Sequence, residues 1–363
     1  MRARSYCSLL SVAAAALLAL PNTAQAQACP GPSDTFWKND VLVDDPVGIV
    51  PVGAAVLTPF CQGEAAGSYF QLAPGSAPQY LKQVSMGFGD IQNAGTFQAV
   101  LNIEIYEGTP TFNPGFNVIM PPKVFDLAID GGTSMNVTSS GMQSFDLSPY
   151  NIVLEDDFIV AFRLVQNVSF SICQPATIGH DANMLTDAAA NLTCVSGKNL
   201  LDERDNGWVD PADWLFDGFI SPICPTFYAG NFLIRACTED AGTWVDEGGG
   251  TSGAFGPVTL TGTGPLTFGS LNPVTLTNAT PGAIMLSWIS FTSTPVNFFG
   301  GTIYANPFNV QLIFIANAGG GFSGAAPWPA LPPGTEVWFQ FLVEDNTVIF
   351  GITLSNAMKA TTP

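Results

Sequence analysis

The sequence predicts an all-β protein, with two β-sandwich-like domains in tandem behind a signal peptide. Short apolar runs with period-two alternation recur along the chain, and turn residues separate them, with 37 Gly and 28 Pro in 363 residues. Such spacing is typical of β-sandwiches. The chain is also longer than a usual single domain, and its cysteine content and charge both change near residue 240. We therefore expect two β modules.

Residues 1–26 have the features of a secretory signal peptide. Arg2 and Arg4 form the basic start, residues 9–20 are apolar, and the small residues of Ala24-Gln25-Ala26 suit a cleavage site. We therefore expect an exported protein, either secreted or held at the cell surface. An alternative, lipoprotein cleavage before Cys29, would tether the chain through that residue.

The mature chain is strongly acidic. Removing Arg2 and Arg4 leaves eight bases against 29 acids, a formal net charge of −21. Nucleic acid is therefore not an expected partner, because binding phosphates needs basic patches. No later stretch reaches the roughly 18 consecutive apolar residues of a spanning helix, so an integral membrane protein is not expected either.

Six cysteines remain after cleavage, namely Cys29, Cys61, Cys173, Cys194, Cys224 and Cys237. In an exported chain an even number predicts disulfides, here three bonds, and six cysteines allow fifteen pairings. The cysteines have neither CxxC nor cysteine–histidine metal spacing, which argues against zinc.

The domain boundary is predicted near residue 240. All six cysteines fall within residues 27–240, which hold 24 acids and 7 bases. Residues 241–363 hold 5 acids and one base. We thus expect a disulfide-containing, jelly-roll-like sandwich over 27–240 and a second sandwich over 241–363, beginning at TWVDEGGGTSG, residues 243–253.

Three apolar runs predict strands of the first domain. Residues 101–106 place Leu101, Ile103 and Ile105 on one face and polar residues on the other, which predicts a half-buried strand. Residues 158–165 repeat the pattern with more burial, and residues 232–236 close the domain. Residues 181–201 are rich in Ala and Leu, yet Asn, Gly and flanking cysteines favour a long loop over a helix.

The second domain has strand-like runs at 283–290, 310–315, 336–343 and 348–354. Since it has no cysteine and few charges, apolar packing between two sheets must stabilise it. The run GGGFSG at 319–324 fits a dinucleotide-binding fingerprint, but that motif needs a following helix. Pro327 and Pro329 oppose a helix, so we expect a hairpin loop.

Residues 243–363 resemble a recurrent C-terminal module of large secreted and surface proteins of planctomycetes, myxobacteria and related bacteria. The matching segments are WVDEGGG at 244–250, LTGTGPL at 260–266, ATPGA at 279–283, WFQ at 338–340 and LSNA at 354–357. Residues 27–240 more loosely resemble the β-sandwich modules that precede it, through FCQGE at 60–64, IEIYEGT at 103–109 and FLIRA at 232–236. The resemblance implies an extracellular, non-enzymatic β protein.

Catalytic motifs are scarce. His180 is the sole histidine, so a Ser–His or Cys–His mechanism would have to use it, and the chain has no GxSxG motif. A glycan hydrolase needs only two opposed carboxylates. Acidic residues are plentiful, but their positions in the sequence do not show which two would face each other.

An acidic segment over 202–213 is the candidate metal site. Its oxygen ligands, which suit Ca²⁺, would be Asp202, Asp205, Asn206, Asp210 and Asp213. Arg204 at the third position opposes a regular EF-hand loop, which leaves an irregular calcium site against a solvated turn. The acidic run at 155–157 is more typical of a turn.

Trp208 and Trp214 flank these acidic turns and are candidate ligand-binding residues, because aromatic rings form stacking platforms for sugars; a packing role is the alternative. Our hypothesis is an exported structural, adhesive or ligand-binding protein without catalytic activity, with a polysaccharide or a surface protein as partner. The alternatives are a carbohydrate-binding module and a glycan-active hydrolase.

Overall fold

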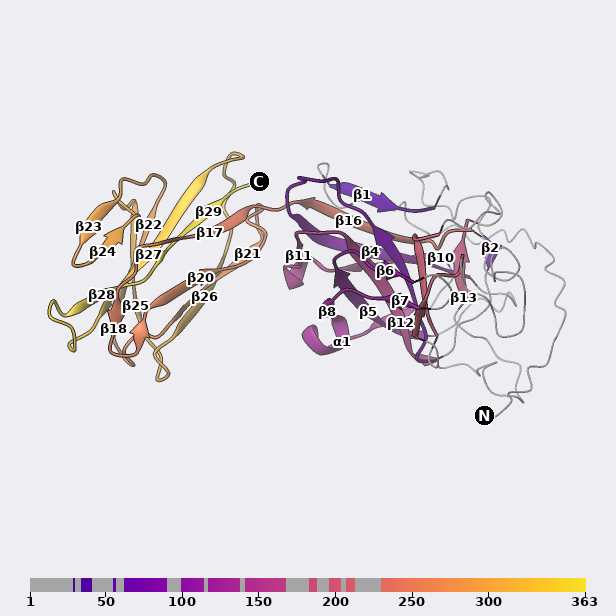
Figure 1. Ribbon diagram of the computed structural model, residues 1–363, viewed down its shortest axis with the longest axis horizontal. Coiled ribbons are helices and arrows are strands. Elements are labelled where there is room, and N and C mark those ends of the chain that lie inside the picture. Colours follow the sequence, from indigo (N-terminus) through magenta and orange to yellow (C-terminus); the bar gives the residue numbers. More distant parts are fainter. Residues whose placement is uncertain are drawn as a thin grey trace.

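The structure is a computed structural model, which describes residues 29, 34–40, 55–56, 62–89, 99–113, 117–137, 141–167, 183–187, 196–203, 207–212 and 230–363 (Figure 1). Strands make up 55% of the described residues and helix 3%, which confirms the all-β prediction. The described helices are a single turn, α1 (Leu127–Asp130), and a 3-10 turn over Ser148–Tyr150. Among the described residues, no helix is long and apolar enough to cross a membrane.

Two antiparallel sheets form the N-terminal part. The first runs in the order β1 (Thr35–Lys38), β16 (Ile234–Asp240), β4 (Gln79–Gly89), β13 (Asn183–Thr186) and β2 (Ala55–Val56), with β10 (Gly141–Asp146) and β11 (Val153–Leu154) also paired to β4. The second runs β15 (Gly207–Val209), β14 (Asn199–Glu203), β3 (Ala65–Phe70), β12 (Phe158–Asn167), β5 (Ala99–Glu107) and β8 (Lys123–Asp126), with β9 (Met135–Val137) on β5. A two-stranded ribbon joins β6 (Thr111–Phe112) and β7 (Val118–Ile119).

Side chains of both sheets build one core between them. Met86 and Phe88 come from β4, and Ile103, Phe158 and Phe162 come from β5 and β12; all five are fully buried. Each buried side chain of this size contributes about 1.5–3 kcal/mol. The alternating apolar residues seen in the sequence are therefore what holds the two sheets together.

The predicted strands over 101–106 and 158–165 are confirmed as parts of β5 and β12. The half-buried interpretation of the first is wrong, because Asn102, Glu104 and Tyr106 are only 5%, 2% and 6% exposed. Charged and aromatic side chains from neighbouring strands cover this second face of the sheet. The polar residues at alternate positions of β5 thus belong to a buried polar cluster and do not face solvent.

Two further predicted segments, the strand over 232–236 and the loop over 181–201, differ in part from the structure. β16 begins at Ile234, while Phe232 makes an isolated bridge to Thr186. The loop expected over 181–201 contains β13 and the start of β14, because Leu185 and Leu200 are buried in the sheets. Residues 188–195 lie outside the described part of the chain.

The C-terminal part has its own two facing sheets. The larger runs β17 (Thr243–Gly248), β29 (Ala357–Thr361), β27 (Glu336–Glu344), β22 (Ile284–Ser290) and β25 (Val310–Ile315), with β28 (Ile352–Leu354) also on β27. The smaller runs β20 (Thr259–Gly262), β21 (Leu271–Thr277) and β26 (Phe322–Pro327). Two short ribbons join β18 (Ser252–Gly253) to β19 (Gly256–Pro257) and β23 (Val296–Phe298) to β24 (Gly301–Ile303).

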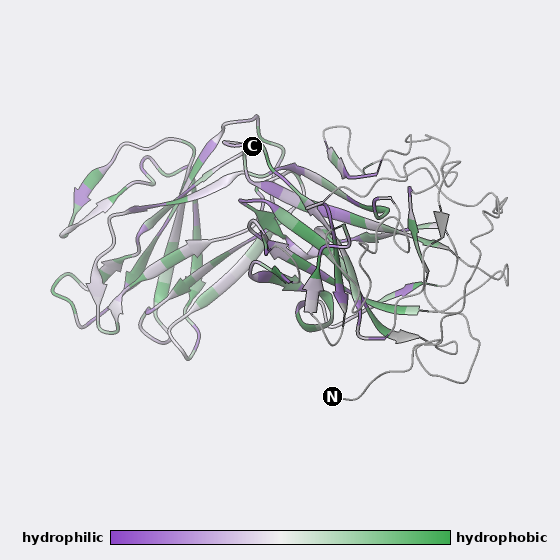
Figure 2. Cartoon of the chain, turned by 45° about the vertical axis from the view of Figure 1, so that its right-hand side comes forward, coloured by the Kyte–Doolittle hydropathy of each residue, from purple (hydrophilic) through white to green (hydrophobic). Residues whose placement is uncertain are grey.

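The C-terminal core contains no cysteine, as the sequence requires. Met285, Phe341 and Val343 of the larger sheet pack with Leu260 and Leu276 of the smaller one. In Figure 2 hydrophobic stretches, drawn in green, follow the strands of both parts of the chain. Apolar packing between sheet faces thus stabilises this part, as predicted.

The four predicted C-terminal strands correspond to β22, β25, β27 and β28, and three of them agree within about a residue. The run 348–354 was too long, because β28 begins only at Ile352. The preceding residues form a turn in which the Asp345 amide donates to Gly351 O at 2.9 Å and Gly351 has a φ of 70°.

The glycine-rich segments are ordered turns. In TWVDEGGGTSG, a Cβ on Gly249 would lie 2.5 Å from Thr302 O, and one on Gly250 would lie 2.7 Å from Asn356 N. This close packing against the sheet is unlike a free linker. The hairpin predicted at 319–324 is wrong, because β25 and β26 belong to different sheets, and the turn carries the chain from one sheet to the other.

Every described strand pairing lies either within residues 35–240 or within 243–361. The hydrophobic clusters divide in the same way, with members up to Ala236 in one part and from Trp244 onward in the other. The break coincides with the boundary expected near 240. The division into two independently folded domains stays a prediction.

Candidate binding surfaces

Trp208 is the predicted ligand-binding residue that the structure describes. It lies on β15, half-buried, with its ring edge-on to Tyr106 at a centroid distance of 5.9 Å. The guanidinium carbon of Arg163 lies 5.9 Å from the centroid of the indole. Contact with these two side chains makes Trp208 part of the polar cluster on the second face of the sheet. Trp214 lies outside the described residues.

A buried carboxylate, Glu104, is the centre of that cluster. It accepts hydrogen bonds from Arg163 Nε at 2.9 Å and Nη2 at 3.0 Å, and from the Tyr106 hydroxyl at 2.7 Å. Lys123 Nζ lies 3.0 Å from its Oε1. Its two oxygens are therefore saturated by donors of this chain.

The charges of the cluster are mutually stabilised. Burial alone would raise the pKa of Glu104, but the hydrogen bonds from Arg163 and Tyr106 outweigh it and hold the pKa below its usual value of 4.5. Burial, and the neighbouring Glu104 carboxylate, raise the pKa of Tyr106. The cluster stays ionised at neutral pH, which suits a structural ion-pair network rather than a proton-transferring pair.

The acidic segment over 202–213 begins as a β-hairpin. Asp202 pairs with Trp208 across β14 and β15, and its Oδ2 accepts from Arg163 Nη1 at 2.7 Å. Asp210 accepts from the Gly197 amide at 2.6 Å and from the Ser196 hydroxyl at 3.0 Å. Both carboxylates thus fix local structure.

The other candidate calcium ligands, Asp205, Asn206 and Asp213, lie outside the described residues, as does His180. Within the residues that the structure describes, no group of three or more His, Cys, Asp or Glu side chains is placed to hold a metal ion. Calcium binding therefore stays a prediction.

One predicted disulfide is present. Cys29 is bonded to Cys237, which ties the N-terminal segment to β16 across a separation of 208 residues, with a Cα–Cα distance of 5.5 Å. In the loop-entropy model, a bond closing so long a loop stabilises the fold by about 5 kcal/mol. Cys61, Cys173, Cys194 and Cys224 lie outside the described part of the chain, so their pairing stays a prediction.

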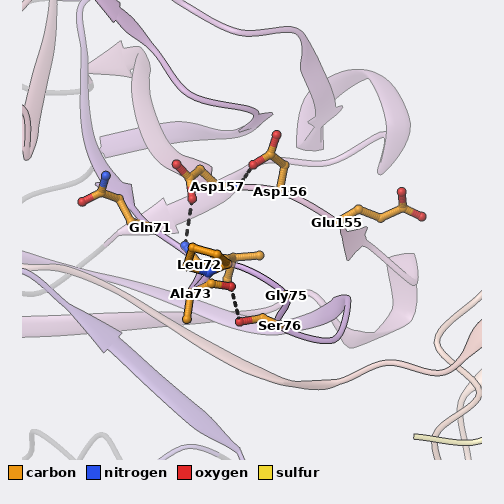
Figure 3. A pocket seen from close by; sticks show the side chains of 9 residues that line it. Gln71, Leu72, Ala73, Gly75, Ser76, Glu155, Asp156 and Asp157 are labelled. Carbon is orange, nitrogen blue, oxygen red and sulfur yellow. Dashed lines mark hydrogen bonds between the residues drawn. The ribbon is translucent and has the colours of Figure 1, made fainter.

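A depression of about 600 Å³ lies beside the acidic run 155–157, between it and residues 71–76 (Figure 3). Asp157 holds the facing loop in place, because it accepts from the Leu72 amide at 2.8 Å and from the Thr109 hydroxyl at 3.1 Å. Glu155 and Asp156 are exposed. The run is a turn that leads into β12, as the sequence predicted.

An exposed apolar surface lies on the C-terminal sheet. On β22 and β25, Ile284 is 51% exposed, Ile313 is 68% exposed and Ile315 is 70% exposed. The register sets Ile315 opposite Ile284 and Ile313 opposite Leu286, so all four side chains share one face. The alternate residues, Met285 and Phe314 among them, point into the core.

We call this surface the outer apolar face; its residues are Ile284, Leu286, Trp288, Phe308, Ile313 and Ile315. Phe308 stacks on Trp288 at a centroid distance of 4.8 Å. The ribbon of β23 and β24 covers part of the sheet, where Phe298 and Ile303 pack beside Leu286 and Trp288. The isoleucines beyond the ribbon remain uncovered by any described residue. At the tip of the ribbon, Phe299 stacks on Phe350.

The outer apolar face lies in an uncharged region. Residues 248–335 contain no Asp, Glu, Lys, Arg or His, so all 39 acidic and basic side chains of the chain lie elsewhere. Glu344 on β27 is the acid nearest in register, one strand beyond Ile284. The sequence showed the low charge and the strand-like runs but not the surface, because apolar residues at successive positions do not show which face of a sheet is left uncovered.

Comparison with known proteins gives no assignment. No protein-family model matches this chain, and no curated protein is significantly similar to it. The resemblance of residues 243–363 to a bacterial surface-protein module stays a prediction. The outer apolar face and its surroundings are therefore the basis for a functional proposal.

Proposed function

We propose that this chain is an exported extracellular or cell-surface protein with a structural or adhesive role, which binds through the outer apolar face and has no catalytic activity. The observation that carries the proposal is the exposure of Ile284, Ile313 and Ile315, at 51%, 68% and 70%, on two adjacent strands. Soluble monomers rarely leave large contiguous apolar patches uncovered, and such patches mark interaction sites.

The energetics favour an apolar, uncharged ligand surface. Completing the burial of each of these half-exposed isoleucines adds part of the roughly 1.5–3 kcal/mol that full burial of such a side chain contributes. Because residues 248–335 are uncharged and the nearest charge in register is the acid Glu344, an anionic partner would lose hydration at this surface without gaining an ion pair. Binding should therefore depend weakly on salt.

Two features support export. Residues 1–26 have the pattern of a signal peptide, and disulfides such as Cys29–Cys237 persist in oxidising compartments. The acidic surface of residues 27–240 would keep a secreted protein in solution. The acidic and apolar regions would then have separate roles, one for solubility and the other for contact.

Glycan binding through Trp208 and Trp214, and glycan hydrolysis by paired carboxylates, stay as alternatives. In the described part of the chain, Trp208 contacts Arg163, and the carboxylates of Glu104 and Asp202 are both paired with that same arginine. No contact there favours either alternative over binding through the outer apolar face.

The test compares two variants of the mature chain on alkyl-coated beads and on isolated cell envelopes. The triple variant Ile284→Thr, Ile313→Thr and Ile315→Thr should lose retention on both, because it removes apolar area and keeps strand propensity. Ile129→Thr is the matched control, since Ile129 is 79% exposed but lies on α1 of the N-terminal part. Equal retention of both variants would overturn the proposal.

A further inference from the structure

β25 is the last strand of its sheet and leaves one backbone edge open. Among the described strands it pairs with β22 alone. At its end the Ala316 amide donates to Ala283 O at 3.0 Å and Ala316 O accepts from the Gly282 amide at 3.2 Å, so both backbone groups of residue 316 point toward β22. Hydrogen-bonded pairs alternate along antiparallel strands. The backbone N–H and C=O groups of Gln311, Ile313 and Ile315 therefore point away from β22, toward the open edge.

This edge lacks the features that keep sheet edges apart. Natural proteins protect such edges with charged residues, proline, bulges or a covering segment. The six residues of β25, VQLIFI, contain neither a charge nor a proline, and all but Phe314 are exposed. The same residues that offer free backbone groups, Ile313 and Ile315, also carry exposed apolar side chains.

The opposite edge of the sheet is protected. β17 carries Asp246 and Glu247, and Lys359 on the neighbouring β29 lies 2.9 Å from Glu247. A strand that added to β17 would meet these charges, whereas a strand that added to β25 would meet none. The two edges of the same sheet therefore differ in what they can accept.

We infer that a second copy of this chain covers the β25 edge, by antiparallel pairing of β25 with β25 of the other copy. This inference rests on the proposed function, because β25 is a strand of the outer apolar face, and it adds a second copy of the chain as the partner at the edge of that face. A two-fold axis at Ile313 sets Ile313 opposite its own counterpart and Gln311 opposite Ile315 of the second copy. The open groups of residues 311, 313 and 315 then bond to each other across the axis.

Pairing of β25 with β25 fits the distribution of charges better than pairing of β25 with β17, the other edge strand of the sheet. Two neutral strands meet without desolvating a charge, and the acidic residues all lie outside 248–335. Pairing of β25 with β17 of another copy would set Asp246 and Glu247 against isoleucines, and it would build an open fibre. A two-fold pair is closed, so association stops at the dimer.

Side chains on both faces gain contacts in this arrangement. On the outer apolar face the two Ile313 side chains become direct cross-strand neighbours. On the inner side Leu312, which is 43% exposed, sits opposite Phe314 of the second copy. Cross-strand apolar pairs add to the backbone hydrogen bonds, at about 0.2–1 kcal/mol each.

Cysteine crosslinking of the full mature chain tests the register. In Ile313→Cys the two thiols would face each other at the axis, with a Cα separation of about 5.5 Å, which a disulfide spans. We expect a covalent dimer under mild oxidation. Ile284→Cys, one strand in from the edge, is the matched control and should stay uncrosslinked, as should the unsubstituted chain.

Sedimentation velocity tests the association itself. The unsubstituted chain should be dimeric, and Ile313→Lys should weaken the dimer at least tenfold by placing two like charges at the axis. Ile349→Lys should not, because Ile349 is 95% exposed on the turn after β27. Crosslinking through Ile284→Cys instead of Ile313→Cys would overturn the edge pairing.

Failure of self-pairing and failure of the proposed function would give different results. A chain that is monomeric at every concentration but still binds alkyl beads and envelopes would overturn self-pairing and leave the proposed function standing. A chain that is monomeric and also fails to bind would overturn both. Folding of each variant is checked by its thermal unfolding against the unsubstituted chain.

Discussion

Arg163 holds the buried carboxylate of Glu104 through two parallel hydrogen bonds, from Nε at 2.9 Å and Nη2 at 3.0 Å. The side chain of Glu104 is only 3% exposed, and a third donor group of the same arginine reaches Asp202. One cation thus bridges two acids, and Lys123 Nζ supplies a second positive charge 3.0 Å from Glu104 Oε1. In a chain with 29 acids, this explains how a sheet face dense in carboxylates stays folded.

Removing Arg163 should destabilise the N-terminal part strongly. Arg163→Met leaves Glu104 buried without its bidentate partner, and breaking a buried pair in this way costs about 3–5 kcal/mol. Urea unfolding measures the loss. Arg163→Lys keeps the charge but not the paired geometry and should lose less, while the double variant Arg163→Met with Glu104→Gln should recover part of the stability. An unchanged urea midpoint in Arg163→Met would show that the pair contributes nothing.

Stability should fall in acid because of the same pair. Burial opposes ionisation of Glu104, but its hydrogen bonds win, so the folded-state pKa lies below the unfolded-state value near 4.5. The unfolded chain then binds a proton at higher pH than the folded chain does. The contribution of Glu104 is full above its unfolded pKa and is lost as pH falls through its folded pKa.

Unfolding free energies measured by urea between neutral pH and pH 3 check this. The unsubstituted chain should lose stability as pH drops below about 4.5, in the range where carboxylates protonate. Glu104→Gln has no proton to gain and should show a shallower slope. The same slope in both proteins would mean that Glu104 is not among the groups responsible for the loss.

Two glycines near the start of the C-terminal part should differ in their tolerance to alanine. Gly249 has a φ of 82° and a Cβ there would lie 2.5 Å from Thr302 O, whereas Gly256 has a φ of 97° with open space around it. Gly256→Ala should cost about 1–2 kcal/mol from backbone strain alone. Gly249→Ala should cost about 1–3 kcal/mol more from the added overlap. Equal melting temperatures would contradict the close packing of this turn against β24.

The sequence predicted the fold class well because burial leaves a periodic pattern. β12 and β5 follow it, and the boundaries of β25 agree to the residue with the predicted run. The polar cluster could not be predicted, because Glu104 and Arg163 are 59 residues apart and meet only through the register of β12 on β5. A hint was present in the acid at an alternate strand position, which looked like an exposed residue.

The binding surface was harder to foresee for the opposite reason. The apolar run at 310–315 predicted a strand but not its place in a sheet, and sheet order sets β25 at an edge, where no other described strand covers it. Sheet order depends on pairing between distant segments and is not encoded in local periodicity. The low charge of residues 241–363 was visible in the sequence, but the sequence did not show that an exposed apolar sheet face lies within this region.

Hydrogen–deuterium exchange of the mature chain, free and saturated with cell envelopes, tests the central claim most directly. If the chain acts through the outer apolar face, β25 and β22 should gain protection beyond any that self-pairing gives the free chain, and the hairpin of β14 and β15 that carries Trp208 should not. Protection confined to that hairpin, with β22 and β25 unchanged, would contradict the proposal and favour the glycan-binding alternative.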